Sequence, residues 1–134
     1  MLVIDASIAV HLAIVGAMPD ALSAAVPIAP PLLWSEASSA LHELAFRGEL
    51  DTATADAAIG RLDDLAIARR PWPGLHVEAA RIARQLGWAK TYDAEYVALA
   101  RLSGARLLTL DARLRRGAGR LVPIIGPTEL VQPR

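Results

Sequence analysis

TYDAEYVALARLSGARLLTLDARL, residues 91–114, is the stretch of sequence that decides the fold. Thr91 is expected to cap a helix that carries an apolar face, and Gly104 stands where the end of that helix would need a left-handed residue. The apolar run at residues 107–110 is typical of a buried parallel strand. Asp111 follows this run directly, and a second helix is expected to begin there. Helix, tight turn, strand and helix therefore follow one another within 24 residues.

Helix-like and strand-like segments alternate along the rest of the chain. Helical spacing of apolar residues predicts helices over 5–15, 21–25, 32–47, 51–68 and 75–86. Short strands are expected at 2–4, around Ile28, directly before a proline-rich break at 69–74, at 107–110 and at 121–125. Pro123 places the last of these strands at a sheet edge. The pattern predicts an α/β fold with a small parallel sheet of short strands flanked by helices, in one domain over residues 1–134.

Composition excludes several kinds of protein. The formal net charge of the 134 residues is zero, so no overall basic field favours binding to nucleic acid. The chain has no cysteine, so it has neither disulfides nor a thiolate metal site, and any metal would be bound by oxygen or imidazole. The apolar N-terminus lacks the basic region of a signal peptide, and no stretch is long enough to span a membrane. We expect a soluble cytoplasmic protein with no membrane partner.

Four acidic residues follow the expected strands or begin the expected helices. Asp5 and Asp111 each stand between an apolar strand and a helix, where an aspartate commonly caps the helix. Asp93 lies in a first helical turn, where a negative charge interacts favourably with the helix dipole. Glu36 begins a largely apolar helix, where a charge needs a partner or access to solvent. Taken singly, the three aspartates have a structural explanation as well as a functional one.

The expected topology brings these four acids together. Because Asp5 and Asp111 both end strands of one parallel sheet, they face the crevice at its carboxyl edge, where open α/β sheets bind ligands. Asp93 and Glu36 begin helices on the same side of the sheet. Few cations lie in these segments, Lys90 being the nearest to Asp93, so four carboxylates would repel one another. A divalent cation removes this conflict. Mg²⁺ and Mn²⁺ suit carboxylate and water oxygens, activate a water molecule and stabilise a phosphoryl oxyanion.

The four acids lie in segments that resemble the acidic motifs of PIN-domain ribonucleases, specifically the VapC-type toxins of bacterial toxin–antitoxin pairs. The segments are VIDAS (residues 3–7), LLWSEASSALHE (32–43), YDAEYVALA (92–100) and LLTLDARL (107–114). They occur in the order of the family's motifs and cover nearly the whole length. The resemblance implies a PIN-like three-layer fold and a divalent-metal-dependent endoribonuclease that leaves 5′-phosphate and 3′-hydroxyl products.

The resemblance also implies a role for individual residues. The catalytic quartet would be Asp5, Glu36, Asp93 and Asp111. Of these, the three aspartates would be ligands of Mg²⁺, for which Mn²⁺ would substitute. Two small hydroxyl residues beside the metal site would be Ser7 and Thr109. No departure from the family's pattern is visible at the four acids.

A basic cluster stands just beyond the last acid. Arg113, Arg115 and Arg116 form either a solvated turn or a rim that binds RNA phosphates. In a helix that starts at Ala112, Arg113 and Arg116 share a face and Arg115 lies to one side. We expect these arginines to bind the phosphate beside the scissile one.

A toxic nuclease needs an inhibitor, so the resemblance implies a cognate VapB-type antitoxin as partner, and a homodimer. The Ala- and Leu-rich helices expected over 7–15 and 32–47 could offer an apolar groove for such a partner.

Other classes with an aspartate after the first strand fit less well. A phosphatase with an aspartyl nucleophile needs a second acid two positions on, where this chain has Ser7. A receiver domain needs paired acids after its first strand and a lysine after its last, and the sequence has neither. The alternative that stays open is a catalytically inactive PIN-like module that acts by binding protein partners. Divalent-metal-dependent cleavage of RNA separates it from the nuclease.

Overall fold

The strands form one parallel sheet at the centre of the protein, which confirms the expected α/β class. The computed structural model describes residues 1–130, and the last four residues of the expected domain, 131–134, lie outside this range. The strands pair in the order β3-β2-β1-β4-β5. They are β1 (Leu2–Ile4), β2 (Pro27–Ala29), β3 (Ala68–Arg69), β4 (Arg106–Leu108) and β5 (Ile124–Ile125).

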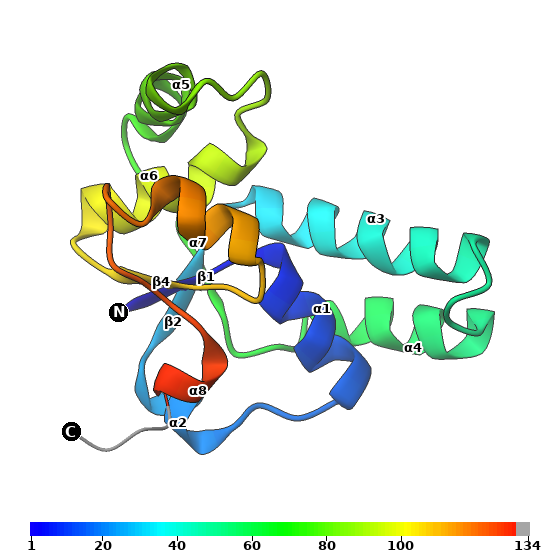
Figure 1. Cartoon of the computed structure of the whole chain (residues 1–134). Helices are drawn as coiled ribbons and strands as arrows, with labels where there is room; N and C mark the ends of the chain where they lie inside the picture. The colour runs from blue at the N-terminus through cyan, green and yellow to red at the C-terminus, as the bar shows by residue number, and fades with distance from the viewer. Residues whose placement is uncertain (131–134) are drawn as a thin grey trace.

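Helices connect and flank the strands (Figure 1). They are α1 (Ala6–Val15), α2 (Asp20–Ala24), α3 (Leu32–Phe46), α4 (Thr52–Leu62), α5 (Leu75–Leu86), α6 (Tyr92–Ser103), α7 (Ala112–Ala118) and α8 (Pro127–Leu130). In Figure 1, α6 and α7 lie above the sheet and α2 and α8 below it, while α3 and α4 extend to the right as an antiparallel pair. Helix α6 packs on β1 and β4, and α5 packs on α6.

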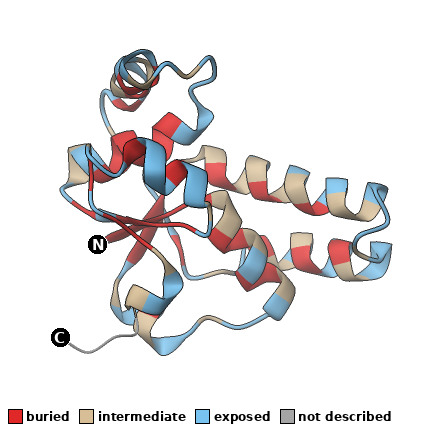
Figure 2. Cartoon of the chain, in the orientation of Figure 1, coloured by how far each residue is buried: buried red, intermediate tan, exposed pale blue. Residues whose placement is uncertain are grey.

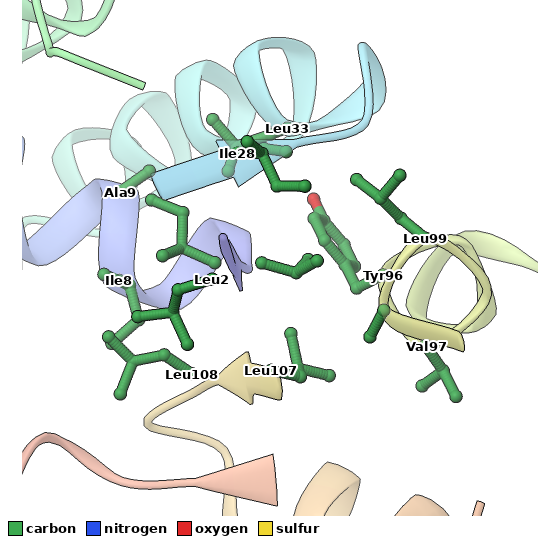
Figure 3. Packing of buried hydrophobic residues seen from close by; sticks show 14 of the residues in the cluster. Leu2, Ile8, Ala9, Ile28, Leu33, Tyr96, Val97, Leu99, Leu107 and Leu108 are labelled. Atoms are coloured by element: carbon green, nitrogen blue, oxygen red, sulfur yellow. The ribbon is translucent and has the colours of Figure 1, made fainter. Parts of the chain in front are cut away.

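The core is centred on β1, the middle strand. Leu2, Val3 and Ile4 are all 0% exposed, because helices cover both faces of a parallel sheet and every side chain of its central strand is buried. In the register, Leu2 lies between Pro27 of β2 and Arg106 of β4. Figure 2 shows β1 and β2 as buried, and Figure 3 shows side chains from β1, β4, α1, α3 and α6 meeting around them.

The prediction of a helix over 51–68 was wrong at its end, because α4 stops at Leu62. Leu65 and Ile67 continue an apolar spacing that looks helical, but they pack against the core from turns and an irregular segment. The chain has to leave the helix there in order to enter β3, where Ile28 pairs with Ala68. Apolar spacing alone does not distinguish these two ways of burying the same side chains.

Two details around the central segment also differ from expectation. The strand expected at 107–110 ends at Leu108, and Leu110 is 50% exposed, because the backbone N–H of Leu110 donates to the Ser7 hydroxyl instead of continuing the strand. Thr91 stands at the N-cap position of α6, but its backbone is helical (φ −99°, ψ −2°) and its side chain makes no capping hydrogen bond. Gly104 does end α6 in the left-handed conformation, with φ 72°.

Candidate active site

The structure brings the four predicted acids together at the carboxyl edge of the sheet. Asp5 follows β1 and Asp111 precedes α7, while Glu36 and Asp93 lie near the starts of α3 and α6. Glu36, Asp93 and Asp111 line a cleft of about 600 Å³. Asp5 is only 5% exposed, and its charge interacts with those of Asp93 and Glu36. Three of the four predicted acids therefore line one cleft, and Asp5 is buried near enough for its charge to interact with two of them.

Asp5 is held by three hydrogen bonds. The Ser7 hydroxyl donates to Oδ1 at 2.6 Å, and the backbone N–H of Ile8 donates to the same oxygen at 3.2 Å. The Thr109 hydroxyl donates to Oδ2. The bond from Ile8 makes Asp5 the N-cap of α1, so the capping role considered from the sequence is also fulfilled. Asp5 is thus both a structural cap and a member of the acidic group.

The two hydroxyl residues named from the sequence join the first and fourth strands. Besides donating to Asp5, the Ser7 hydroxyl accepts from the backbone N–H of Leu110 at 3.1 Å. The Thr109 hydroxyl accepts from the backbone N–H of Asp111 at 2.9 Å. Ser7 and Thr109 therefore fix the segment that carries Asp111 relative to Asp5, although 106 positions separate the two acids in the sequence.

Asp111 caps the short helix α7. Its Oδ1 accepts from the backbone N–H groups of Arg113 at 2.9 Å and Leu114 at 3.3 Å. Both bonds use Oδ1, so the cap leaves Oδ2 available to a ligand. Like Asp5, Asp111 caps the start of a helix, and the position of that helix start in the fold brings the aspartate to the cleft.

Glu36 has a partner that the sequence analysis missed. The Tyr96 hydroxyl donates to Glu36 Oε1 at 2.5 Å, joining α6 to α3. Tyr96 is 1% exposed, and Figure 3 shows its hydroxyl directed away from its own helix. The available signal was the position of Tyr96 three residues after Asp93, which places the two on neighbouring positions of one helix.

The electrostatics of the group favour a bound cation. Burial raises the pKa of the Asp5, Glu36 and Asp93 carboxyls, and the neighbouring acids raise each of them further. Hydrogen bonds from Ser7, Thr109 and Ile8 act in the opposite direction on Asp5, but burial outweighs them. Glu95, a fifth acid that is 7% exposed, adds to the repulsion at Glu36. A positive charge in the cleft would relieve this repulsion.

The donor set fits a hydrated Mg²⁺ or Mn²⁺ better than a fully enclosed ion. The side chains that line the cleft include two cations, Lys90 and Arg113, against three acids. Within residues 1–130, however, no three acidic or imidazole groups stand close enough to hold a metal together. Mg²⁺ commonly keeps several waters and binds through one or two carboxylates, so it does not need such a cage. Carboxylate oxygens are among the ligands that Mg²⁺ prefers, and the excess of acids over cations in the cleft leaves a negative charge for the ion to balance.

The three arginines beyond Asp111 occupy different environments. Arg113 lines the cleft, with Nε 3.7 Å from Asp111 Oδ1, and its charge lowers the pKa of Asp93. Arg115 forms an ion pair with Glu129, with Nη1 2.5 Å from Oε1. Arg116 is exposed on α7. Only Arg113 is therefore placed among the acids, and the expectation that the three form one phosphate-binding rim stays a prediction.

The sequence model of the PIN domain family matches residues 2–120. The chain therefore belongs to the PIN domain family, and the expected family is confirmed. A solved structure agrees with this assignment. The crystal structure of PAE2754 from Pyrobaculum aerophilum superposes with a TM-score of 0.71 and 27% sequence identity, covering 97% of this chain and 93% of that one.

Curated relatives narrow the comparison within the family. The chain is 36% identical over 115 residues to the VapC ribonuclease Mb0985 of Mycobacterium bovis. It is also 36% identical over 115 residues to Ribonuclease VapC9 of Mycobacterium tuberculosis. In both cases the alignment covers 85% of this chain and 88% of the relative.

Proposed function

We propose that this protein is a divalent-metal-dependent endoribonuclease that acts as the toxin of a type II toxin–antitoxin pair. The observation that carries the proposal is the cleft lined by Glu36, Asp93 and Asp111, with Asp5 buried close by, in a chain 36% identical to proteins named as VapC ribonucleases. Paired acids at the carboxyl edge of a parallel sheet suit hydrolysis of a phosphodiester at a metal site.

Asp5, Asp93 and Asp111 would hold Mg²⁺, with Mn²⁺ able to replace it. One or two of them would bind the ion directly and the rest through its waters, since no three acids among residues 1–130 are close enough to bind one ion together. When bound, the ion lowers the pKa of a water molecule and stabilises charge on the phosphoryl oxygens. Ser7 and Thr109 keep Asp5 in place through their hydroxyl groups. Glu36 adds a fourth carboxylate to the acidic group and lines the cleft, where it can accept a hydrogen bond from an attacking water and orient it.

The cations of the cleft would bind the substrate. Lys90 and Arg113 line the same cleft as the acids, so they can contact phosphates on either side of the scissile bond. An acidic centre repels RNA until a cation neutralises it, which makes these side chains the source of attraction in a chain with no net charge. Cleavage by water in line with the 3′ oxygen would leave 5′-phosphate and 3′-hydroxyl ends.

The direct test is cleavage of a labelled RNA by the purified protein in Mg²⁺, in Mn²⁺ and in EDTA. We expect cleavage only with metal, and we expect Asp5→Asn and Asp93→Asn to abolish it. Asp56→Asn is the matched control, because Asp56 is an exposed acid on α4 away from the cleft. Cleavage that persists in EDTA would contradict the metal dependence. A well-folded wild type with no nuclease activity would favour the alternative of a PIN-like binding module.

We also propose two partners for this protein, an antitoxin and a second copy of the chain. We expect an antitoxin encoded by a small open reading frame beside this gene, which should co-purify with the protein and suppress cleavage. Helices α1 and α3 pack side by side, and Val15 and Phe46 at their ends are 59% and 85% exposed, so an apolar segment could cover them. A homodimer is likewise expected, and light scattering of the purified chain measures it. A gene that is harmless when expressed alone, although its product cleaves RNA in vitro, would count against the toxin assignment.

A further inference from the structure

We infer that Tyr96 is a positioning residue for the active site, because its hydroxyl fixes the orientation of the Glu36 carboxylate. The inference concerns one bond, from the Tyr96 hydroxyl to Glu36 Oε1 at 2.5 Å. It rests on the proposed metal-dependent nuclease function and adds a residue to it.

The ring of Tyr96 packs in the core, and its hydroxyl is not needed for that packing. Tyr96 is 1% exposed and belongs to the hydrophobic core, where a phenylalanine ring would bury nearly the same apolar surface. A buried hydroxyl has to be hydrogen-bonded to avoid an energetic penalty, and its partner here is Glu36, 60 positions away in the sequence. The fold thus carries a polar atom in its core and directs it at an acid of the cleft.

The chemistry of the bond defines its effect. Burial and the Glu36 charge both raise the pKa of Tyr96, so the phenol keeps its proton and donates to the carboxylate. The hydrogen bond also favours the ionised form of Glu36, against the burial that disfavours it. With Oε1 held by Tyr96, the carboxylate loses its freedom to rotate, and Oε2 is left for a water or a cation in the cleft.

The bond also joins two elements that carry separate parts of the site. Asp93 and Tyr96 stand on α6, and Glu36 stands on α3. Because Tyr96 lies one helical turn from Asp93, its hydrogen bond ties the Glu36 carboxylate to the part of α6 that carries Asp93. Hydrogen-bond partners of this kind, outside the direct ligands, commonly change metal affinity or activity by about 10- to 100-fold when removed.

The test is a double-mutant cycle between Tyr96→Phe and Glu36→Ala, read out as Mn²⁺ affinity by calorimetry and as RNA cleavage. Tyr96→Phe should lower Mn²⁺ affinity or kcat by about 10-fold or more and leave KM for RNA unchanged. In the Glu36→Ala background, Tyr96→Phe should have no further effect on either quantity, because its partner is already absent. Circular dichroism and thermal melting establish that each variant is folded.

Ser103→Ala is the matched control, because it removes another hydroxyl of α6, which donates to the Leu99 carbonyl at 2.6 Å. It should leave Mn²⁺ affinity and kcat unchanged. Equal losses from Tyr96→Phe with and without Glu36 would assign Tyr96 to packing and overturn the inference, as would wild-type behaviour of Tyr96→Phe. Failure of the wild type itself to bind Mn²⁺ would overturn the proposed function, and the inference with it, so the two failures are distinguishable.

Discussion

Asp93 is the residue at which structural and functional explanations can be separated most cleanly. Burial and the neighbouring Asp111 raise its pKa, so its charge is unfavourable in the metal-free fold. We expect Asp93→Asn to melt at the same or a higher temperature than the wild type in EDTA, and to lose most of the stabilisation that Mn²⁺ gives. Differential scanning calorimetry with and without Mn²⁺ measures both effects.

Asp56→Asn serves again as the control and should keep the full response to Mn²⁺. A metal-free Asp93→Asn protein that melts several degrees lower would show that the acid chiefly serves the helix dipole of α6.

The arginines of α7 can be distinguished because they lie in different environments. Arg113 lies among the acids, so Arg113→Ala should weaken RNA binding but strengthen Mn²⁺ binding, since a competing positive charge leaves the cleft. Arg116→Ala should weaken RNA binding alone. Each lost phosphate contact should lower the slope of log affinity against log salt by about 0.7 for a single strand.

Fluorescence anisotropy with a fluorescent RNA over a salt series, and calorimetry with Mn²⁺, separate the two variants. Arg115→Ala provides the comparison, because its ion pair with Glu129 predicts a smaller effect on the salt slope. An unchanged slope in Arg113→Ala and Arg116→Ala would leave these arginines as solvated side chains.

Tyr92 offers an aromatic surface at the cleft. It lines the cleft beside Asp93 and is 50% exposed. An exposed ring beside a phosphate-binding site can stack on an unpaired base, which contributes about 1–3 kcal/mol per base. Tyr92→Ala should therefore weaken RNA binding by roughly this amount, while Tyr92→Phe should retain affinity because it keeps the ring. Anisotropy with catalytically inactive Asp93→Asn as the background measures binding without cleavage, and equal affinities for the two Tyr92 variants would exclude stacking.

At the scale of elements, the end of α6 gives a sharp stability prediction. Gly104 has φ 72°, and a Cβ built there would meet no atom within 4 Å, so only backbone strain opposes a side chain. Gly104→Ala should cost about 1 kcal/mol or more of unfolding free energy. Gly60 within α4 also has open space around it but no positive φ, so Gly60→Ala should stabilise the protein by about 0.5–1 kcal/mol. Urea unfolding of both variants measures the difference, and a stabilising Gly104→Ala would contradict the conformational argument.

The elements also show where sequence reasoning succeeds and where it stops. Strands β1 and β4 could be predicted because an apolar run precedes each of the helix caps Asp5 and Asp111, although β4 ends at Leu108 and not at Leu110. The end of α4 could not be predicted, because Leu65 and Ile67 keep an apolar spacing typical of a helix although they pack against the core from an irregular segment. The acids of the site followed from local position and topology. The Tyr96 bond did not, since a tyrosine in an apolar helix gives no indication of which distant residue its hydroxyl meets.

For the whole molecule, the raised pKa values predict how stability changes with pH. In the folded state the pKa values of Asp5, Glu36, Asp93 and Glu95 are raised above their ordinary values. The folded protein therefore binds protons that the unfolded chain releases, and the free energy of unfolding should fall as pH rises from about 4, the ordinary carboxyl range, through the raised values. The pKa values of Asp51 and Glu129 are lowered and act in the opposite direction. Asp51 is exposed and Glu129 keeps 37% of its side-chain surface accessible, so solvent screens both charges.

Urea unfolding in EDTA between about pH 4.5 and pH 7.5 measures this dependence. This range begins near the ordinary carboxyl pKa and extends above it. Saturating Mg²⁺ should flatten or reverse it, because a bound cation favours the ionised carboxylates. Asp93→Asn should show a shallower dependence than the wild type. If the stability of the metal-free protein rose with pH, hydrogen bonds and not burial would determine the pKa values of these acids.

Other properties of the whole molecule are less accessible from the sequence. The α/β class and the grouping of the acids follow from alternating elements and from the rule that parallel strands share one carboxyl edge. Across residues 1–130, no helix has the length and apolar character needed to cross a membrane. The different environments of Arg113 and Arg115 could not be predicted, because Arg115 pairs with Glu129 and no local sequence pattern connects Glu129 to α7.

The hydroxyl bond from Thr109 to Asp5 has a consequence for the way the protein is made. Of the described strands, β1 is synthesised before the others and is the centre of the sheet, whereas one of its two neighbours, β4, is synthesised after β2 and β3. Until residues 109–111 have emerged from the ribosome, Asp5 lacks one of its three donors and Asp111 cannot join the other acids. A nascent chain that has not yet released this segment therefore holds only part of the acidic group, and the group is completed only after β4 has been made.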